Sequence, residues 1–161
     1  MEGTIMLDKD RRKKRTIKAI VVLYSIIVFF ILFGREPFDI GYSYLEHIKM
    51  NINITPFYTI ATLCRQIINR TNPHLLKYSL ANLFGNIALF IPYGILVPIL
   101  FTKYRKMWTY LIHAAIIIFV IEIVQFLSLR GSFDIDDFLL NLFGAMIGYL
   151  LFRVIWRWSK H

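Results

Sequence analysis

The chain has 161 residues, of which 57% are hydrophobic and only 18% are charged, and its formal net charge is +9. A soluble domain of this length needs more charged surface, so this composition excludes an ordinary soluble protein and indicates lipid as the solvent. The positive charge does not predict nucleic-acid binding, because the basic residues flank apolar runs, where they act as topology signals and contact anionic lipid headgroups.

Four apolar runs have the length needed to cross a hydrocarbon core of about 30 Å. They predict transmembrane helices at about residues 17–34, 80–101, 107–127 and 138–156. One further segment outside these runs has a helical pattern. The sequence therefore predicts an all-α integral membrane protein with four transmembrane helices plus an extracytoplasmic amphipathic helix.

The basic residues predict how the helices are oriented. They gather before the first helix, in K-Y-R-K at 103–106 and after the last helix. Since Lys and Arg of short loops tend to stay in the cytoplasm, both termini are expected there, with residues 1–16 as a basic cytoplasmic tail. A cleaved signal peptide is the alternative for the first helix, but G-R-E-P-F at 34–38 is not a small-residue cleavage site, so an uncleaved anchor is expected.

The outward segment between the first two spans contains the amphipathic pattern, at about residues 55–70. Thr55 is the expected N-cap and Pro56 the first helical residue. We expect the helix to lie on the outer membrane face, either as a lid packed on the bundle or in contact with a ligand. Its expected apolar side comprises Phe57, Ile60, Ala61, Cys64, Ile67 and Ile68, and its polar side includes Thr59, Thr62, Gln66 and Asn69.

Polar residues interrupt three of the predicted spans at similar depth. Within each span they share one helical face, and all lie in the outer half of the membrane. Unpaired polar groups are costly in hydrocarbon, so these side chains should converge on one polar pocket open to the outside. The predicted pocket comprises Asn82, Asn86, Glu122, Gln125 and Asn141, roofed by Arg130, Asp134, Asp136 and Asp137.

Each of these residues also has a simpler structural interpretation. Glu122 could form a hydrogen bond that only holds the bundle together, or pair with Arg35 or Arg130. The three aspartates could bind a divalent cation through their oxygens, although D-x-D-D is a weak pattern. No other cofactor is expected. Gly144 and Gly148 form G-x-x-x-G, which predicts close packing of the fourth span on its polar side.

The ordered motifs of the chain resemble those of the VanZ-like membrane proteins. They are N-I-T-P-F-Y-T-I at 53–60, N-L-F-G-N-I-A-L-F-I-P-Y-G at 82–94, E-I-V-Q at 122–125, R-G-S-F-D-I-D-D at 130–137 and N-L-F-G-A-M-I-G at 141–148. The resemblance covers most of the chain beyond the first helix and implies a VanZ-like membrane domain at 17–161. Thr55 departs from the apolar residue expected before the proline.

This resemblance implies a bacterial plasma-membrane protein that accompanies glycopeptide resistance genes and raises resistance to teicoplanin more than to vancomycin. It supplies no molecular mechanism. The positions that match the family motifs are Asn53, Pro56, Phe57, Asn82, Gly85, Asn86, Pro92, Gly94, Glu122, Gln125, Arg130, Asp134, Asp137, Asn141, Gly144 and Gly148.

Three mechanisms are compatible with the predicted pocket. In the first, which we favour, it binds or masks a membrane lipid, a lipid-linked cell-wall precursor or the lipid tail of the drug. In the second, Glu122 and a cation held by the aspartates act on a polyprenyl-linked or phospholipid substrate; no Ser/His/Asp or Cys/His arrangement supports an enzyme. The third, a transporter, would need a homo-oligomer, because four helices without a repeat are few.

Overall fold

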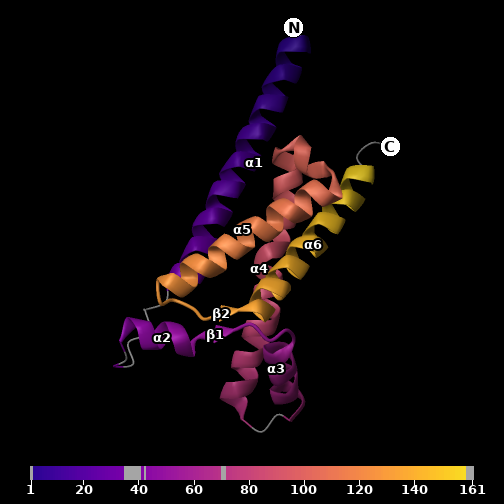
Figure 1. Ribbon diagram of the computed structural model, residues 1–161. Coiled ribbons are helices and arrows are strands. Elements are labelled where there is room, and N and C mark those ends of the chain that lie inside the picture. Colours follow the sequence, from indigo (N-terminus) through magenta and orange to yellow (C-terminus); the bar gives the residue numbers. More distant parts are fainter. Residues whose placement is uncertain (1, 35–40, 42, 70–71, 159–161) are drawn as a thin grey trace.

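The computed structural model describes residues 2–34, 41, 43–69 and 72–158 (Figure 1). Four of its helices are long and apolar enough to cross a membrane, so the chain is an all-α, multi-pass membrane protein, as predicted. They are α1 (Glu2–Phe33), α4 (Pro73–Leu100), α5 (Met107–Leu127) and α6 (Ile135–Trp158). A short 3₁₀ helix, η1 (Thr102–Arg105), joins α4 to α5.

The bounds of the membrane-spanning helices agree with the predicted apolar runs in some places and extend beyond them in others. α5 has the predicted bounds, whereas α4 begins at Pro73 rather than near residue 80. Its start is fixed by Asn72, whose Oδ1 accepts a hydrogen bond of 2.9 Å from the backbone N–H of His74. The added turns contain His74 and Lys77, so a search for apolar runs misses them. α1 similarly continues through the basic tail to Glu2.

Glycines bring α4 and α6 together as the most extensively packed pair. The position of a Cβ at Gly144 is already filled by the carbonyl of Ile87, and that of a Cβ at Gly148 by the carbonyl of Ile91. A step of four residues along one helix thus matches a step of four along the other, so the two helices run parallel (Figure 1). This confirms the close packing predicted from G-x-x-x-G.

The apolar core occupies the half of the bundle near the termini. Tyr110, in the first turn of α5, stacks on Tyr149 of α6 at 4.6 Å between ring centroids and donates a hydrogen bond of 2.9 Å to the carbonyl of Ala145. His113 accepts or donates in a 2.8 Å hydrogen bond with Tyr93, away from the polar residues. The other core members are Phe90, Ala114, Ile118 and Phe152. The opposite half of the bundle is therefore left for the polar side chains.

The segment between α1 and α4, which is predicted to be outward, lies at the end of the bundle opposite the termini (Figure 1). It contains α2 (Tyr44–Met50), β1 (Ile52–Asn53) and α3 (Tyr58–Asn69), and β1 pairs in parallel with β2 (Phe133–Asp134) just before α6. We did not predict α2. Its signal is the capping box S-Y-L-E, in which the backbone N–H of Ser43 donates a 2.9 Å hydrogen bond to Glu46.

The predicted start of α3 is wrong. The helix begins at Tyr58, after Phe57 with φ of +64°, so Thr55 is not its N-cap and Pro56 precedes it. Residue 70, the predicted end, lies outside the described residues. On this helix Phe57 and Ile68 of the predicted apolar side are exposed, and Gln66 of the polar side accepts a 2.6 Å hydrogen bond from Ser79 of α4. α3 thus forms a hairpin with the first turns of α4.

Candidate functional site

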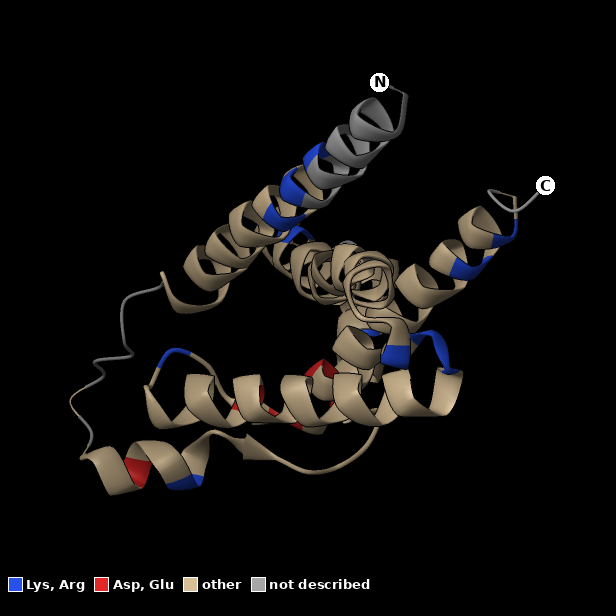
Figure 2. Cartoon of the chain, turned by 90° about the horizontal axis from the view of Figure 1, so that it is seen from above, with Lys and Arg blue, Asp and Glu red and all other residues tan. Residues whose placement is uncertain are grey.

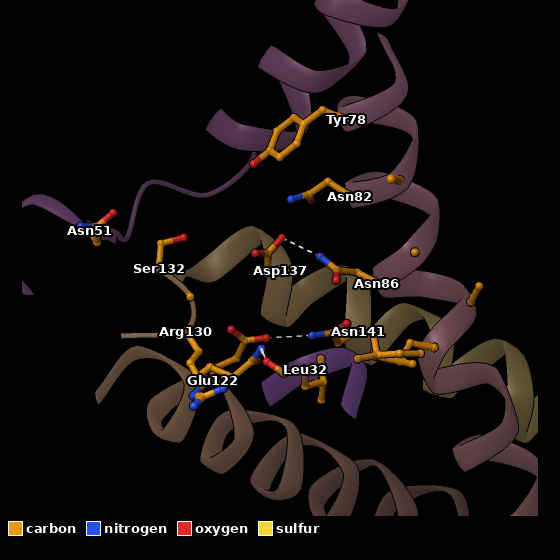
Figure 3. A pocket seen from close by; sticks show the side chains of 17 residues that line it. Leu32, Asn51, Tyr78, Asn82, Asn86, Glu122, Arg130, Ser132, Asp137 and Asn141 are labelled. Atoms are coloured by element: carbon orange, nitrogen blue, oxygen red, sulfur yellow. Dashed lines mark hydrogen bonds between the residues drawn. The ribbon is translucent and has the colours of Figure 1, made fainter. Parts of the chain in front are cut away.

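A cavity of about 630 Å³ lies in the half of the bundle opposite the termini. Figure 3 shows polar side chains from α4, α5 and α6 pointing toward one another across it. The helices contribute Ile31 and Leu32 of α1, Tyr78, Ala81, Asn82, Gly85, Asn86, Ala88 and Leu89 of α4, Glu122 and Gln125 of α5, and Asp137 and Asn141 of α6. The remaining lining residues are Asn51, which follows α2, and Arg130, Gly131 and Ser132, which lie between α5 and β2.

One buried hydrogen bond joins α5 to α6 at this cavity. Nδ2 of Asn141 donates to Oε1 of Glu122 at 2.8 Å, and the two residues are only 2% and 4% exposed (Figure 3). In this arrangement the Asn141 amide directs its nitrogen toward Glu122 and its own oxygen away from it. That oxygen is buried and has no hydrogen-bond partner among the described residues.

A second pair joins α4 to α6. Nδ2 of Asn86 donates a hydrogen bond of 2.7 Å to Oδ1 of Asp137 (Figure 3). One turn earlier on α4, Asn82 also lines the cavity, and its buried Oδ1 has no partner in the described part of the chain. The two pairs and Asn82 form a polar floor with buried acceptor oxygens.

Gln125 and Arg130 line the cavity but direct donors to α1. Nε2 of Gln125 donates a 3.1 Å hydrogen bond to the carbonyl of Leu32, and the Arg130 guanidinium donates to the carbonyl of Phe33. These carbonyls end α1 and have no acceptor role within the helix. The two side chains therefore fasten the end of α1 and close one side of the cavity. Arg35, the other candidate cation, lies outside the described residues.

The carboxyl groups of Asp134, Asp136 and Asp137 are not directed to one common site. Asp134 accepts hydrogen bonds from Thr59 at 2.6 Å and from Asn53 at 3.3 Å, and it does not line the cavity, contrary to the prediction. Asp136 is fully buried and accepts from the backbone N–H groups of Phe57 at 2.6 Å and Ile60 at 3.0 Å.

Asp136 thus caps α3 from a distant element, which explains the unexpected start of that helix. Only Asp137 faces the cavity. Among the described residues, no group of three or more His, Cys, Asp or Glu side chains is placed to hold a metal ion. The predicted cation site formed by Asp134, Asp136 and Asp137 is therefore not assembled.

The sequence prediction missed part of the lining. Tyr78 precedes Asn82 and Asn86 at successive steps of four residues, so helical spacing could have identified it. Asn51 and Ser132 lie in segments without periodicity, and no signal marks them. α3 contributes no lining residue, so the hypothesis that this helix contacts a ligand in the cavity gains no support.

Part of the cavity wall is apolar. Ile31, Leu32 and Leu89 contribute hydrocarbon surface, and three small residues line the same face of α4. A Cβ at Gly85 would meet no atom within 4 Å, so the space beside this residue is open. The small residues are Ala81, Gly85 and Ala88. The cavity therefore suits an amphipathic ligand.

Comparison with known proteins identifies a family. A family model described as VanZ/LLP1 matches residues 21–157, which includes all four membrane-spanning helices. No curated protein and no solved structure shows a significant match to the chain.

Proposed function

The chain belongs to the VanZ/LLP1 family, and from this membership and the cavity we propose that it protects bacteria against teicoplanin. It does so by binding or masking a lipid-linked ligand in the outer leaflet of the plasma membrane. The observation that carries this proposal is the cavity itself, whose lining combines buried hydrogen-bonding groups with an apolar wall.

The proposed orientation places the cavity on the outside and both termini in the cytoplasm. Basic residues support it. Among the described side chains, those near the termini and η1 include Arg12, Arg15, Lys18, Lys103, Arg105, Lys106, Arg153 and Arg157 (Figures 1 and 2). The opposite end has fewer, namely Lys49, Arg65, Lys77 and Arg130. This asymmetry is typical of a cytoplasmic location for the termini.

The division of the cavity into two surfaces favours a lipid-linked ligand. The floor, with Glu122, Asn141 and Asp137, can take a polar headgroup. The wall, with Leu32, Leu89 and the open space beside Gly85, can take the start of a hydrocarbon chain. Apolar contact supplies most of the binding free energy of such a ligand, and the few polar groups determine its orientation.

This location offers a physical reason for discrimination between two glycopeptides. Teicoplanin carries an acyl chain that anchors it in lipid, whereas vancomycin does not. A protein that acts at headgroup depth therefore interferes with the membrane-anchored drug more than with the soluble one. The ligand is either the acyl chain of the drug or the lipid-linked cell-wall precursor that the drug captures.

The metal-dependent enzyme gains no specific support from the site. Such an enzyme needs carboxylates that converge on a cation, but Asp134 and Asp136 direct their oxygens to the outward segment. We therefore retain binding as the single proposed function.

Susceptibility testing addresses this proposal directly. Bacteria would express the protein with Glu122→Gln, Asp137→Asn or Asn141→Ala, with membrane levels checked by immunoblot. Loss of teicoplanin protection at a normal protein level is the expected result. Full protection in all three variants would refute a role for the cavity.

A further inference from the structure

A second cavity, of about 310 Å³, lies between α5 and α6 at the end of the bundle that carries the termini (Figure 1). None of its lining residues belongs to the polar cavity described above. It therefore combines two arginines with apolar side chains at a separate place. The lining consists of Met107, the first residue of α5, and of Tyr149, Leu150, Arg153, Val154 and Arg157 of α6.

The two guanidinium groups at this cavity have hydrogen-bond donors to spare. Nη1 of Arg153 donates to the Tyr149 hydroxyl at 3.4 Å, and that hydroxyl donates its own hydrogen to the carbonyl of Arg105 at 2.7 Å. A guanidinium has five N–H donors, so this one contact leaves most of them available. Arg157 is exposed and forms no hydrogen bond or ion pair within the described part of the chain.

The acidic side chains that the structure describes lie far from this cavity. The last of them along α6, Asp137, precedes Arg153 by 16 residues, which is about 24 Å along the helix axis. The others are Glu46, Glu122, Asp134 and Asp136. The positive charge of the cavity is therefore not neutralised by these groups, and it favours a ligand with a phosphate, whose oxygens match the two-pronged geometry of arginine.

The ends of two membrane-spanning helices place this cavity at headgroup depth. Met107 begins one span, and Trp158, which ends another, is next to Arg157. Trp158 is 81% exposed, as expected for a tryptophan at the membrane interface. Leu150, half exposed, lies seven residues before Arg157, or about 10 Å closer to the membrane centre. A phosphate beside the arginines can thus be continued by a hydrocarbon chain beside Leu150.

We propose that this cavity binds one anionic phospholipid from the leaflet on the side of the termini, with its phosphate held by Arg153 and Arg157. The start of an acyl chain lies against Met107, Leu150 and Val154. A zwitterionic phospholipid binds less tightly, because its ammonium group is repelled by the guanidinium groups. This inference does not depend on the proposed function, since the two cavities share no residue.

Lipid binding to the full-length protein tests this site. Native mass spectrometry in detergent counts the bound copies and gives the apparent Kd for phosphatidylglycerol and for phosphatidylcholine with the same acyl chains. The double variant Arg153→Gln/Arg157→Gln removes two positive charges from the cavity. The matched control, Arg15→Gln/Lys18→Gln, removes two charges from exposed positions of α1.

We expect one phosphatidylglycerol to bind the wild type more tightly than phosphatidylcholine. Arg153→Gln/Arg157→Gln should weaken phosphatidylglycerol binding by about five- to thirtyfold, as for the loss of one to two basic contacts with an anionic headgroup, and the control should leave it unchanged. Equal binding of the two lipids, or no effect of the cavity variant, would overturn the inference. So would equal weakening by both variants, which would indicate diffuse attraction to the basic end.

A soluble headgroup distinguishes a lipid from a free phosphate ester. Glycerophosphoglycerol has the phosphodiester of phosphatidylglycerol but no acyl chain. We expect a hundredfold excess of it to leave the bound lipid in place, because the apolar contacts with Leu150 and Val154 are then missing. Displacement at a concentration similar to that of the lipid would show a site for a soluble anion and would overturn the lipid assignment.

Discussion

Asn141 of α6 and Glu122 of α5 form a buried hydrogen bond of 2.8 Å in the half of the bundle opposite the termini. It joins α5 to α6 beside the cavity, and substitutions at either residue test how much this contact contributes to stability.

We expect Asn141→Leu to lower the free energy of unfolding by about 1–3 kcal/mol, because the similar side-chain volume is kept but the carboxyl group loses its donor. Glu122→Gln should leave it close to wild type, since the amide oxygen can accept the same hydrogen bond. Thermal unfolding in detergent measures both, with Asn69→Leu as the surface control. An unchanged stability of Asn141→Leu would contradict the structural role of the pair.

Asp136 and Asp137 are adjacent, but their substitutions should have different effects. Asp136→Ala removes the acceptor for the backbone N–H groups of Phe57 and Ile60, with an expected cost of about 0.5–2 kcal/mol. Faster hydrogen exchange and proteolysis should then be confined to α3. Asp137→Ala, which changes the cavity instead, is the matched control. Equal loosening of α3 in both variants would refute the capping role of Asp136.

We expect substitution by alanine to have opposite effects on stability at Gly148 and at Gly85. In Gly148→Ala the new Cβ meets the backbone of Ile91, so α4 and α6 must separate, at a cost of about 1–3 kcal/mol. In Gly85→Ala the new Cβ has open space, and the gain in helix propensity favours equal or higher stability. A lower melting temperature of Gly148→Ala alone would support the parallel contact, and tolerance of both changes would argue against it.

Gln125 should matter for the position of α1 more than for the rest of the bundle. Gln125→Ala removes the donor to the Leu32 carbonyl, so we expect faster hydrogen exchange in the last turn of α1 and little change in α6. Gln66→Ala, which affects the contact with Ser79, is the control for loss of a glutamine elsewhere. Unchanged exchange in α1 would show that Gln125 does not fasten it.

Helical spacing and the cost of buried polar groups were sufficient to predict much of the site. Glu122, Asn141 and Asn86 converge as expected, because each lies on the polar face of a span at a similar depth. The four spans could be predicted from apolar runs, because each helix must by itself be long and apolar enough to cross the membrane.

The roof could not be predicted in this way. The role of Asp136 depends on where the start of α3 lies, which in turn depends on the pairing of β1 with β2 across a long stretch of chain. The role of Asp134 also depends on the position of α3, because it accepts a hydrogen bond from Thr59 of that helix. In a run of three nearby aspartates, composition alone could not tell these two structural residues from Asp137, which faces the cavity.

The most direct test of the cavity fills it without changing a polar residue. Teicoplanin and vancomycin susceptibility would be compared in bacteria that express the wild type, Gly85→Ala or Gly85→Phe at equal membrane levels. We predict that Gly85→Phe loses teicoplanin protection while Gly85→Ala keeps it, because only the phenyl ring occupies the open space. Full teicoplanin protection by Gly85→Phe would contradict a function in this cavity.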